Sequence, residues 1–269
     1  MYYKTKEEIQ KRLKEISDQI EYADDNHSYK RKSDGKYLHG VSSVVAQINK
    51  PYLVPWASKE NYNYMMANWD LKKKYAQKEK GELLYRAKNA YKEKSDVAKT
   101  LGKDLHTLAE KYIKLIIAEK KGVLKTTSKE MKHGLEQFLK WNKETKVDWI
   151  ASEGLVFSNY YDTAGTFDGL GYINGHLTLI DIKVAKIIGE DYFLQLAGYQ
   201  MMLEEWGIEP IQRLIIQVPK EVDKFLNQIV VPTPYELDRR AFLGALEIKR
   251  SKGHYKSNIQ GSKVVMLRK

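Results

Sequence analysis

The chain has 269 residues, of which 42% are hydrophobic and 11% aromatic, as is typical of a folded globular protein. It contains no cysteine, which excludes disulfides, thiolate zinc sites and an iron–sulfur cluster held by cysteine. The 46 lysines and arginines outweigh the 35 aspartates and glutamates, giving a net charge of +11. This excess favours an anionic partner, most commonly nucleic acid; a lysine-rich surface that only promotes solubility is the alternative.

No apolar run approaches membrane-spanning length, and MYYKTKEEIQ at the start lacks the features of a signal peptide. We therefore expect a soluble cytoplasmic protein with no membrane partner. No repeat or linker divides the chain, so a single domain is expected over residues 1–269. Within it we expect a mainly helical N-terminal region over 1–100, a core over 101–232, and a C-terminal helix and tail over 233–269.

The N-terminal region is predicted to open with an amphipathic helix over 5–23, whose apolar residues Ile9, Leu13, Ile16 and Ile20 share helical spacing. HSYKRKSDGKYL predicts a hairpin that turns at Asp34-Gly35. SSVVAQI and a loop with Pro51 and Pro55 then lead to a lysine-dense helical region that reaches residue 100. LKKKYAQKEK, at 71–80, is interpreted as a solvated helix face, with a phosphate-facing patch as the alternative.

From residue 102 the pattern alternates between helix and strand periodicity. One helix carries the apolar stripe Leu105, Leu108, Ala109, Tyr112 and Ile116, and another is capped by Ser128. WIASEGLVFS predicts a strand, EDYFLQLAGYQMMLEEW a helix, and RLIIQVP and FLNQIVV further strands. Thr233, Pro234 and Glu236 are typical of a capping-box helix start. The order of these elements predicts an α/β fold with a sheet flanked by helices.

Two strands are predicted around Asn174-Gly175 in TAGTFDGLGYINGHLTLIDIKV, because a tight type I′ turn needs positive φ at both central residues. Continuing the register of that hairpin places Asp168 opposite Asp181 and Thr166 opposite Lys183. A bulge at one of the strand glycines would shift this register. Like charges that lie directly opposite each other on neighbouring strands repel, so a positive group is expected between the two aspartates. An acidic surface hairpin neutralised by Lys183 is the alternative reading.

Four short motifs follow one another in the chain: Gly102-x-x-x-His106, Gly165-x-x-Asp168, Asp181-x-Lys183 and Gln195-x-x-x-Tyr199. Together they resemble the PD-(D/E)XK nuclease superfamily, and within it the RecB-like exonucleases of the phage and mitochondrial genome-maintenance type. The resemblance covers roughly residues 100–220. It implies a core of helix, three strands, helix and strand, with a central mixed sheet, here preceded by a helical N-terminal extension.

The resemblance also implies a metal-dependent deoxyribonuclease acting on single- or double-stranded DNA ends in recombination, repair or phage DNA processing. Asp168, Asp181 and Lys183 would be catalytic, and Mg²⁺ or Mn²⁺ would be bound by His106, Asp168, Asp181 and the carbonyl of Ile182. Gln195 and Tyr199 would position the DNA strand, with Tyr199 the favoured residue for stacking on a base. Glu110 and Glu153 are candidates for groups beside the metal ligands, and Ser42, Ser43 and Trp56 for contacts to the DNA end.

Several alternatives remain open at this level. Taken alone, His106 and Tyr199 are more typical of packing residues than of site residues. Glu153 is as typical of a strand-edge charge as of a ligand. An endonuclease of the same fold, including a junction or restriction type, and a DNA-binding protein without catalysis are the competing functions. A glycosidase fits the lysine beside the carboxylates poorly. A recombination or annealing protein is a candidate partner. Because the sequence contains no P-loop motif, any motor is expected to be a separate chain.

Overall fold

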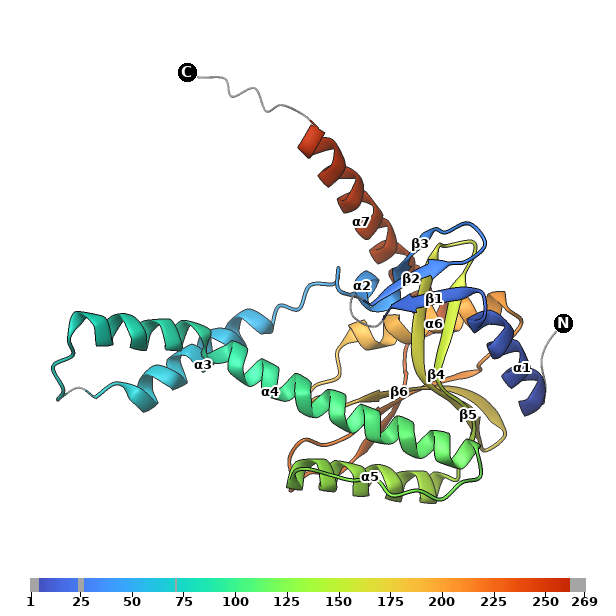
Figure 1. The fold of residues 1–269 in the computed structure, drawn as a ribbon, viewed down its shortest axis with the longest axis horizontal. Helices are drawn as coiled ribbons and strands as arrows, with labels where there is room; N and C mark the ends of the chain where they lie inside the picture. The colour runs from blue at the N-terminus through green and yellow to red at the C-terminus, as the bar shows by residue number, and fades with distance from the viewer. Residues whose placement is uncertain (1–4, 24–26, 71, 262–269) are drawn as a thin grey trace. The chain divides into compact units, whose positions relative to one another are not determined.

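The computed structural model describes residues 5–23, 27–70 and 72–261 (Figure 1). Its helices are α1 (Lys6–Ser17), α2 (Val41–Val45), α3 (Leu53–Asn68), α4 (Gln77–Ile117), α5 (Lys129–Thr145), α6 (Glu190–Glu205) and α7 (Tyr235–Gly261). Its strands are β1 (Ile20–Ala23), β2 (Ser28–Arg31), β3 (Tyr37–Gly40), β4 (Asp148–Ser158), β5 (Thr163–Ile173), β6 (His176–Lys183), β7 (Gln212–Gln217) and β8 (Asn227–Val230).

The chain forms two compact units, one built from the residues up to 48 and from 106 onward, the other from residues 49–105. The first unit contains the whole sheet and the main hydrophobic cluster. The expected boundary near residue 100 therefore differs from the division in the structure. Residues 5–48 are not a helical extension: they add three strands to the sheet, and Ile9, Ile16 and Val44 are fully buried in the main cluster.

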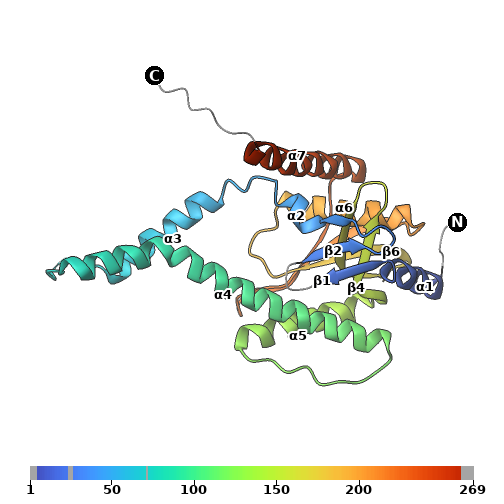
Figure 2. The same cartoon turned by 45° about the horizontal axis from the view of Figure 1, so that its top comes forward.

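The sheet is mixed, with the order β1-β2-β3-β5-β6-β7-β8 and β4 paired to β5. Figure 2 shows α6 and α7 on one side of the strands and α5 on the other. β3 with β5 and β6 with β7 are parallel pairs, whereas β4–β5, β5–β6 and β7–β8 are antiparallel. The order helix, three strands, helix, strand that the sequence predicted is present as α5, β4, β5, β6, α6 and β7. The mixed α/β class is thus confirmed.

Helices cover the sheet because its central strands are apolar on both faces. α6 contributes the buried residues Leu196 and Met202 to the main cluster, and α7 contributes Phe242. Gly198 of α6 leaves room for the Phe242 ring, which would lie 2.7 Å from an added Cβ. α5 packs through aromatic side chains, with the Trp141 and Trp149 ring centroids 6.4 Å apart. These contacts hold the three strands of the β4–β6 meander between helical layers.

The predicted turns are confirmed where glycine and asparagine direct them. Asn174 and Gly175 have φ of 50° and 80°, and the hairpin pairs Ile173 with His176, as the type I′ geometry requires. Gly35 has φ of 69° in the turn between β2 and β3. Ser128 caps α5 by accepting a hydrogen bond from the Met131 backbone N–H at 3.1 Å.

Other boundaries differ from the prediction. α1 ends at Ser17, and Ile20 begins a strand that pairs with β2, so the helical spacing of Ile20 is coincidental. Pro55 lies in the first turn of α3, where a missing N–H costs nothing, not in a loop. Residues 72–76 precede α4 and are not helical. α7 begins at Tyr235, and the Thr233 hydroxyl donates to the Asp238 carboxylate at 2.6 Å in place of the expected capping box.

The second unit, residues 49–105, is built from α3 and the first part of α4. No residue of α3 is buried, and in the part of α4 that belongs to this unit the buried residues are Ala87, Ala90 and, at its end, Leu105. Trp56 meets Tyr91 edge-on at 6.3 Å between ring centroids, and Lys94 forms an ion pair with Glu60. The unit carries 13 lysines and arginines against 7 acidic residues, so a fifth of the chain holds more than half of the net charge.

Within the described ranges, no helix combines the length and the apolar character that a membrane crossing requires.

Candidate active site

The predicted catalytic residues lie where β5 and β6 stop pairing with each other. We call this place the fork; it comprises residues 165–168 of β5 and residues 181–183 of β6. β5 pairs with β3 at Thr163 and Ala164 and with β6 from Gly169 onward, so residues 165–167 pair with β4 only. The expected pairing of Asp168 with Asp181 and of Thr166 with Lys183 is wrong, because the β5–β6 ladder ends at Gly169 and Ile180. β6 instead continues along β7 through Lys183. The fork separates the main chains at the point where the two aspartates would face each other.

The side chain of Asp168 connects the two strands at the fork. Its Oδ2 accepts a hydrogen bond from the Ile182 backbone N–H at 2.6 Å, in place of a main-chain carbonyl across the hairpin. Its Oδ1 lies 3.0 Å from His106 Nε2 on α4. The pKa of Asp168 is lowered, since burial, which raises it, is outweighed by the charges of Lys183 and His106 and by these hydrogen bonds. Asp168 is therefore a carboxylate that joins β5 to both β6 and α4.

His106 lies between two carboxylates. Besides Asp168, its Nδ1 is 3.5 Å from Glu153 Oε1. Burial lowers the pKa of His106, but the charge of Asp168, the hydrogen bond to it and the charge of Glu153 outweigh burial and raise it to about 9. The imidazole is thus protonated at neutral pH, and it lies between Asp168 and Glu153, not between the two aspartates where the sequence predicted a positive group.

Glu153 enters the site from β4 through an unusual backbone conformation. Its φ is 53°, which is rare for a residue with a side chain, and its neighbours pair with Gly169 and Phe167 on either side of Asp168. Burial and the charge of Asp168 raise the pKa of Glu153 to about 7. The next residue is Gly154, where an added Cβ would lie 2.0 Å from the Phe167 ring. A glutamate placed this way joins the site and is not a strand-edge charge.

Asp181 and Lys183 form the second half of the site, with Lys183 Nζ 2.7 Å from Asp181 Oδ1. Burial and the charge of Asp168 raise the pKa of Asp181 to about 6, against the opposing effect of Lys183. The pKa of Lys183 is also raised, because Asp181 and Asp168 outweigh the effect of burial. The ammonium lies 5.3 Å from the centroid of the Tyr192 ring, a contact that the sequence reasoning missed. Tyr192 lies three residues before Gln195 on α6, one helical turn away, and this spacing is the signal that would have found it.

The donor set fits a divalent cation. Ligand atoms of His106, Glu153 and Asp168 lie within 4.8 Å of one another. Glu153 Oε1 and Asp181 Oδ2 are buried and make no hydrogen bond, although buried carboxylate oxygens are normally satisfied. Carboxylate oxygens with one imidazole suit Mg²⁺ or Mn²⁺. Asp181 is outside the three-residue group, and its carboxylate is directed to Lys183.

Gln195 and Tyr199 lie one turn apart on α6, and Gln195 Nε2 is 3.0 Å from the Tyr199 hydroxyl oxygen. Tyr199 is only 3% exposed, and burial raises its pKa. An added Cβ at Gly165 would lie 2.6 Å from the Tyr199 ring, so this glycine makes room for the aromatic side chain. A ring buried to this extent is not accessible for stacking on a base, which argues against that expected role.

The remaining predicted residues lie around the site or away from it. Glu110 pairs with Lys114 at 2.5 Å on α4, and its charge contributes to the raised pKa of Glu153. The Ser43 hydroxyl donates to the Gly40 carbonyl, whereas Ser42 is exposed. Trp56 belongs to the unit of residues 49–105.

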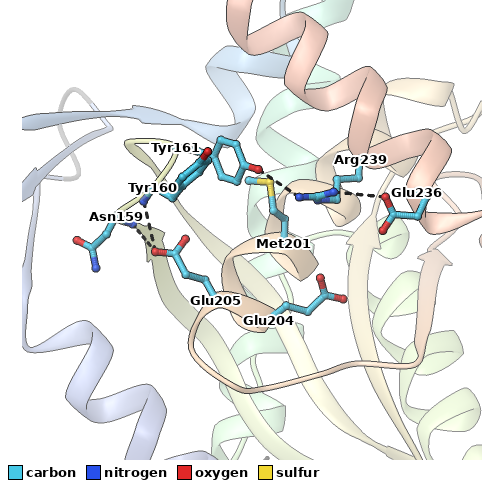
Figure 3. A pocket seen from close by; sticks show the side chains of 8 residues that line it. All are labelled: Asn159, Tyr160, Tyr161, Met201, Glu204, Glu205, Glu236 and Arg239. Atoms are coloured by element: carbon cyan, nitrogen blue, oxygen red, sulfur yellow. Dashed lines mark hydrogen bonds and ion pairs between the residues drawn. The ribbon is translucent and has the colours of Figure 1, made fainter. Parts of the chain in front are cut away.

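A separate hollow of about 930 Å³ lies beside the turn between β4 and β5 (Figure 3). Its polar groups are largely bonded to one another: Glu205 accepts from the backbone N–H groups of Asn159 and Tyr160, and Arg239 donates to the Tyr161 hydroxyl at 3.1 Å. It shares no residue with the cluster around Asp168. We assign the chemistry to the fork and not to this hollow.

Comparisons with known proteins do not assign this chain to a family. No protein-family model and no curated protein matches the chain. Among solved structures, a crystal structure of an alkaline exonuclease (LHK-Exo) from Laribacter hongkongensis matches 55% of this chain and 82% of its own, with 14% identity and a TM-score of 0.29. LHK-Exo in complex with dAMP matches the same shares with 18% identity and a TM-score of 0.28. Scores this low do not establish a shared fold.

Proposed function

We propose that the protein is a metal-dependent DNA exonuclease of the PD-(D/E)XK kind. The observation that carries the proposal is the grouping of His106, Glu153 and Asp168 beside the Asp181–Lys183 pair at the fork. Three carboxylates, one imidazole and one ammonium in a partly buried cluster give a set of cation ligands next to a fixed positive charge. A metal ion that activates water and a positive charge that stabilises the developing negative charge both favour phosphodiester hydrolysis.

His106, Glu153, Asp168 and Asp181, with the carbonyl of Ile182, would hold Mg²⁺ or Mn²⁺. When bound, such a cation neutralises charge on the phosphate and makes water a better nucleophile. The two carboxylate oxygens without hydrogen bonds, on Glu153 and Asp181, support this assignment. The pKa values of Glu153 and Asp181 are raised for one reason in both cases: burial and the nearby negative charge of Asp168 disfavour the ionised carboxylate.

Lys183 would act as a fixed positive charge against the scissile phosphate. The carboxylates around it raise its pKa, so in the metal-free protein it is an ammonium. Its hydrogen bond to Asp181 directs Nζ toward the site, where it orients the attacking water and stabilises the developing negative charge. A role as the general base requires the bound cation to lower its pKa.

DNA would be held mainly through its phosphates. The net charge of +11, more than half of it in residues 49–105, favours contacts that are independent of sequence. Affinity measured in Ca²⁺ across a salt series should then fall linearly on a log–log scale and should be similar for unrelated sequences. A flat salt response or a preference for one sequence would contradict this part of the proposal.

The test of the activity compares linear with covalently closed circular DNA of the same sequence, in Mg²⁺, in Mn²⁺ and in EDTA. An exonuclease degrades only the linear form, and EDTA abolishes the reaction. Cleavage of the closed circle would show that the protein is an endonuclease with the same chemistry. Binding without cleavage in either metal would leave a DNA-binding protein and overturn the proposal.

A further inference from the structure

A small basic hollow lies beyond the carboxyl ends of the parallel strands β6 and β7. Its volume is about 300 Å³, and its polar lining comes from the loops that follow the two strands, with an aromatic ring at the rim. Its lining includes Lys186, Gln217, Lys220, Glu221, Lys224 and Phe225. In open α/β sheets, ligands bind at this edge because the strands end there together.

The hollow is joined to the candidate active site through the β6–β7 pairing. Gln217 pairs with Lys183, and the Val218 backbone N–H donates to the Lys183 carbonyl at 2.9 Å. Gln217 Nε2 donates to the carbonyls of Ala185 and Lys186 at 2.8 and 3.0 Å. Ala185 is two residues beyond Lys183, a span of at most about 7 Å of extended chain. A nucleic-acid strand at Lys183 therefore reaches this hollow within one or two nucleotides.

The charges in the hollow are not balanced. Lys186 pairs with Glu221 at 2.5 Å, and Lys224 lies 3.6 Å from Asp223. Lys220 is half-buried and has no ion pair or hydrogen bond within the part of the chain that the structure describes. Burial lowers its pKa, and the charge of Lys186 adds to this effect against that of Glu221. Among the described residues, no carboxylate is in direct contact with this ammonium, because the neighbouring Glu221 is paired with Lys186.

The rim adds an apolar surface for a base. The Phe225 side chain is 77% exposed, and Val222 and Ile187 in the flanking loops are 57% and 66% exposed. Exposed aromatic residues beside lysines are typical of surfaces that hold single-stranded nucleic acid by stacking and by phosphate contacts.

We propose that this hollow is a phosphate-binding subsite for the nucleic-acid strand, with Lys220 as the donor to the phosphate and Phe225 stacking on an adjoining base. The proposal rests on the nuclease function argued above and extends it to a contact outside the metal cluster. The phosphate is either a terminal phosphate of the strand or a backbone phosphate next to the scissile one.

The test measures the binding of fluorescent oligonucleotides of one sequence in Ca²⁺, with a 5′-phosphate, a 5′-hydroxyl or a 3′-phosphate, across a salt series. The variants are Lys220→Gln, Lys220→Arg and Phe225→Ala, with Lys11→Gln as a control that removes one exposed charge from α1. Lys220→Gln should weaken binding roughly tenfold and reduce the log–log salt slope by about 0.7 to 0.9, the loss of one phosphate contact. Lys220→Arg should restore most of the affinity, and the control should bind as the wild type does.

Which of the three oligonucleotides lose affinity in Lys220→Gln identifies the phosphate that Lys220 contacts. A terminal phosphate predicts a loss confined to the oligonucleotide that carries it, whereas a backbone phosphate predicts equal losses for all three. An unchanged affinity and salt slope for Lys220→Gln, with normal cleavage by the wild type in Mg²⁺, overturns the subsite alone. Absence of cleavage by the wild type overturns the nuclease proposal instead, while the binding data in Ca²⁺ still decide whether Lys220 contacts a phosphate.

Discussion

Replacing Asp181 by asparagine should abolish cleavage and at the same time stabilise the metal-free protein. Asp181 is 1% exposed, one of its oxygens makes no hydrogen bond, and its pKa is raised to about 6 from a usual value of 3.8. The folded protein therefore favours the neutral form of this side chain. Asparagine has nearly the same shape, is always neutral, and keeps an oxygen that can accept the hydrogen bond from Lys183.

The magnitude follows from the two pKa values. A rise from 3.8 to about 6 means that ionised Asp181 costs the folded state about 3 kcal/mol at pH 8. Because the folded-state pKa is raised, this cost develops as the pH increases from below 4 to above 6. Linkage gives a stability difference between Asp181→Asn and the wild type of about 3 kcal/mol at pH 8 and about 1 kcal/mol at pH 4.5.

The assay is urea denaturation of both proteins in EDTA at the two pH values. Asp148→Asn is the control, because Asp148 is largely exposed in its pair with Lys6 and its removal should change stability by less than about 1 kcal/mol. Mg²⁺ at a hundredfold excess over its Kd should stabilise the wild type by roughly 3 kcal/mol and the variant by less. The stability advantage of Asp181→Asn over the wild type should therefore shrink or reverse in Mg²⁺. A variant that is no more stable than the wild type at pH 8, or that cleaves DNA at the wild-type rate, would refute the reasoning.

Three further predictions concern the other residues of the site. Lys183→Ala should lose most turnover and keep DNA affinity in Ca²⁺, because the proposed metal ligands remain; an equal loss of both would make Lys183 a phosphate clamp. Mn²⁺ binding at pH 7.5 should release about one proton, measured by calorimetry in buffers of different ionisation enthalpy, because the pKa of His106 is raised to about 9 and only the neutral imidazole binds metal. Mn²⁺ affinity should therefore weaken as the pH falls, and binding without proton release would exclude His106 as a ligand. Gly165→Ala should destabilise the fold by about 1 to 3 kcal/mol in urea denaturation, because its Cβ would lie 2.6 Å from the Tyr199 ring, whereas Gly244→Ala, with open space around it, should be neutral or stabilising by up to about 1 kcal/mol. Equal effects of the two glycine substitutions would contradict that packing argument.

Much of the fold follows from local patterns in the sequence. The turn at Asn174-Gly175, the cap at Ser128 and the strand WIASEGLVFS depend on neighbouring residues only, and the structure contains all three. Ile20 shows where such reasoning fails, since its spacing fits a helix until its pairing with Arg31 in the next strand is known. The joining of residues 5–48 to the sheet depends on the parallel pairing of β3 with β5, which no local pattern encodes.

The sequence indicated which residues form the candidate site more completely than how they are arranged. The motifs singled out Asp168, Asp181 and Lys183, but they could not show that β5 changes partners between Ala164 and Gly169. This change opens the fork and turns Asp168 toward His106. The positive φ of Glu153 has no signal in the sequence either, since glutamate is not a residue that favours this conformation.

The tight turn at Asn174-Gly175 has a consequence for how this protein can change in evolution. In a two-residue hairpin, the number of residues in the loop fixes which residues of β5 and β6 lie level with each other, and the side-chain direction alternates with every residue. A single insertion there would turn Asp181 and Lys183 away from Asp168, although the turn is far along the strands from all three. Viable length changes in this hairpin should therefore come in pairs of residues. The loop between β7 and β8, which carries Lys220, has no such restriction and can diversify one residue at a time.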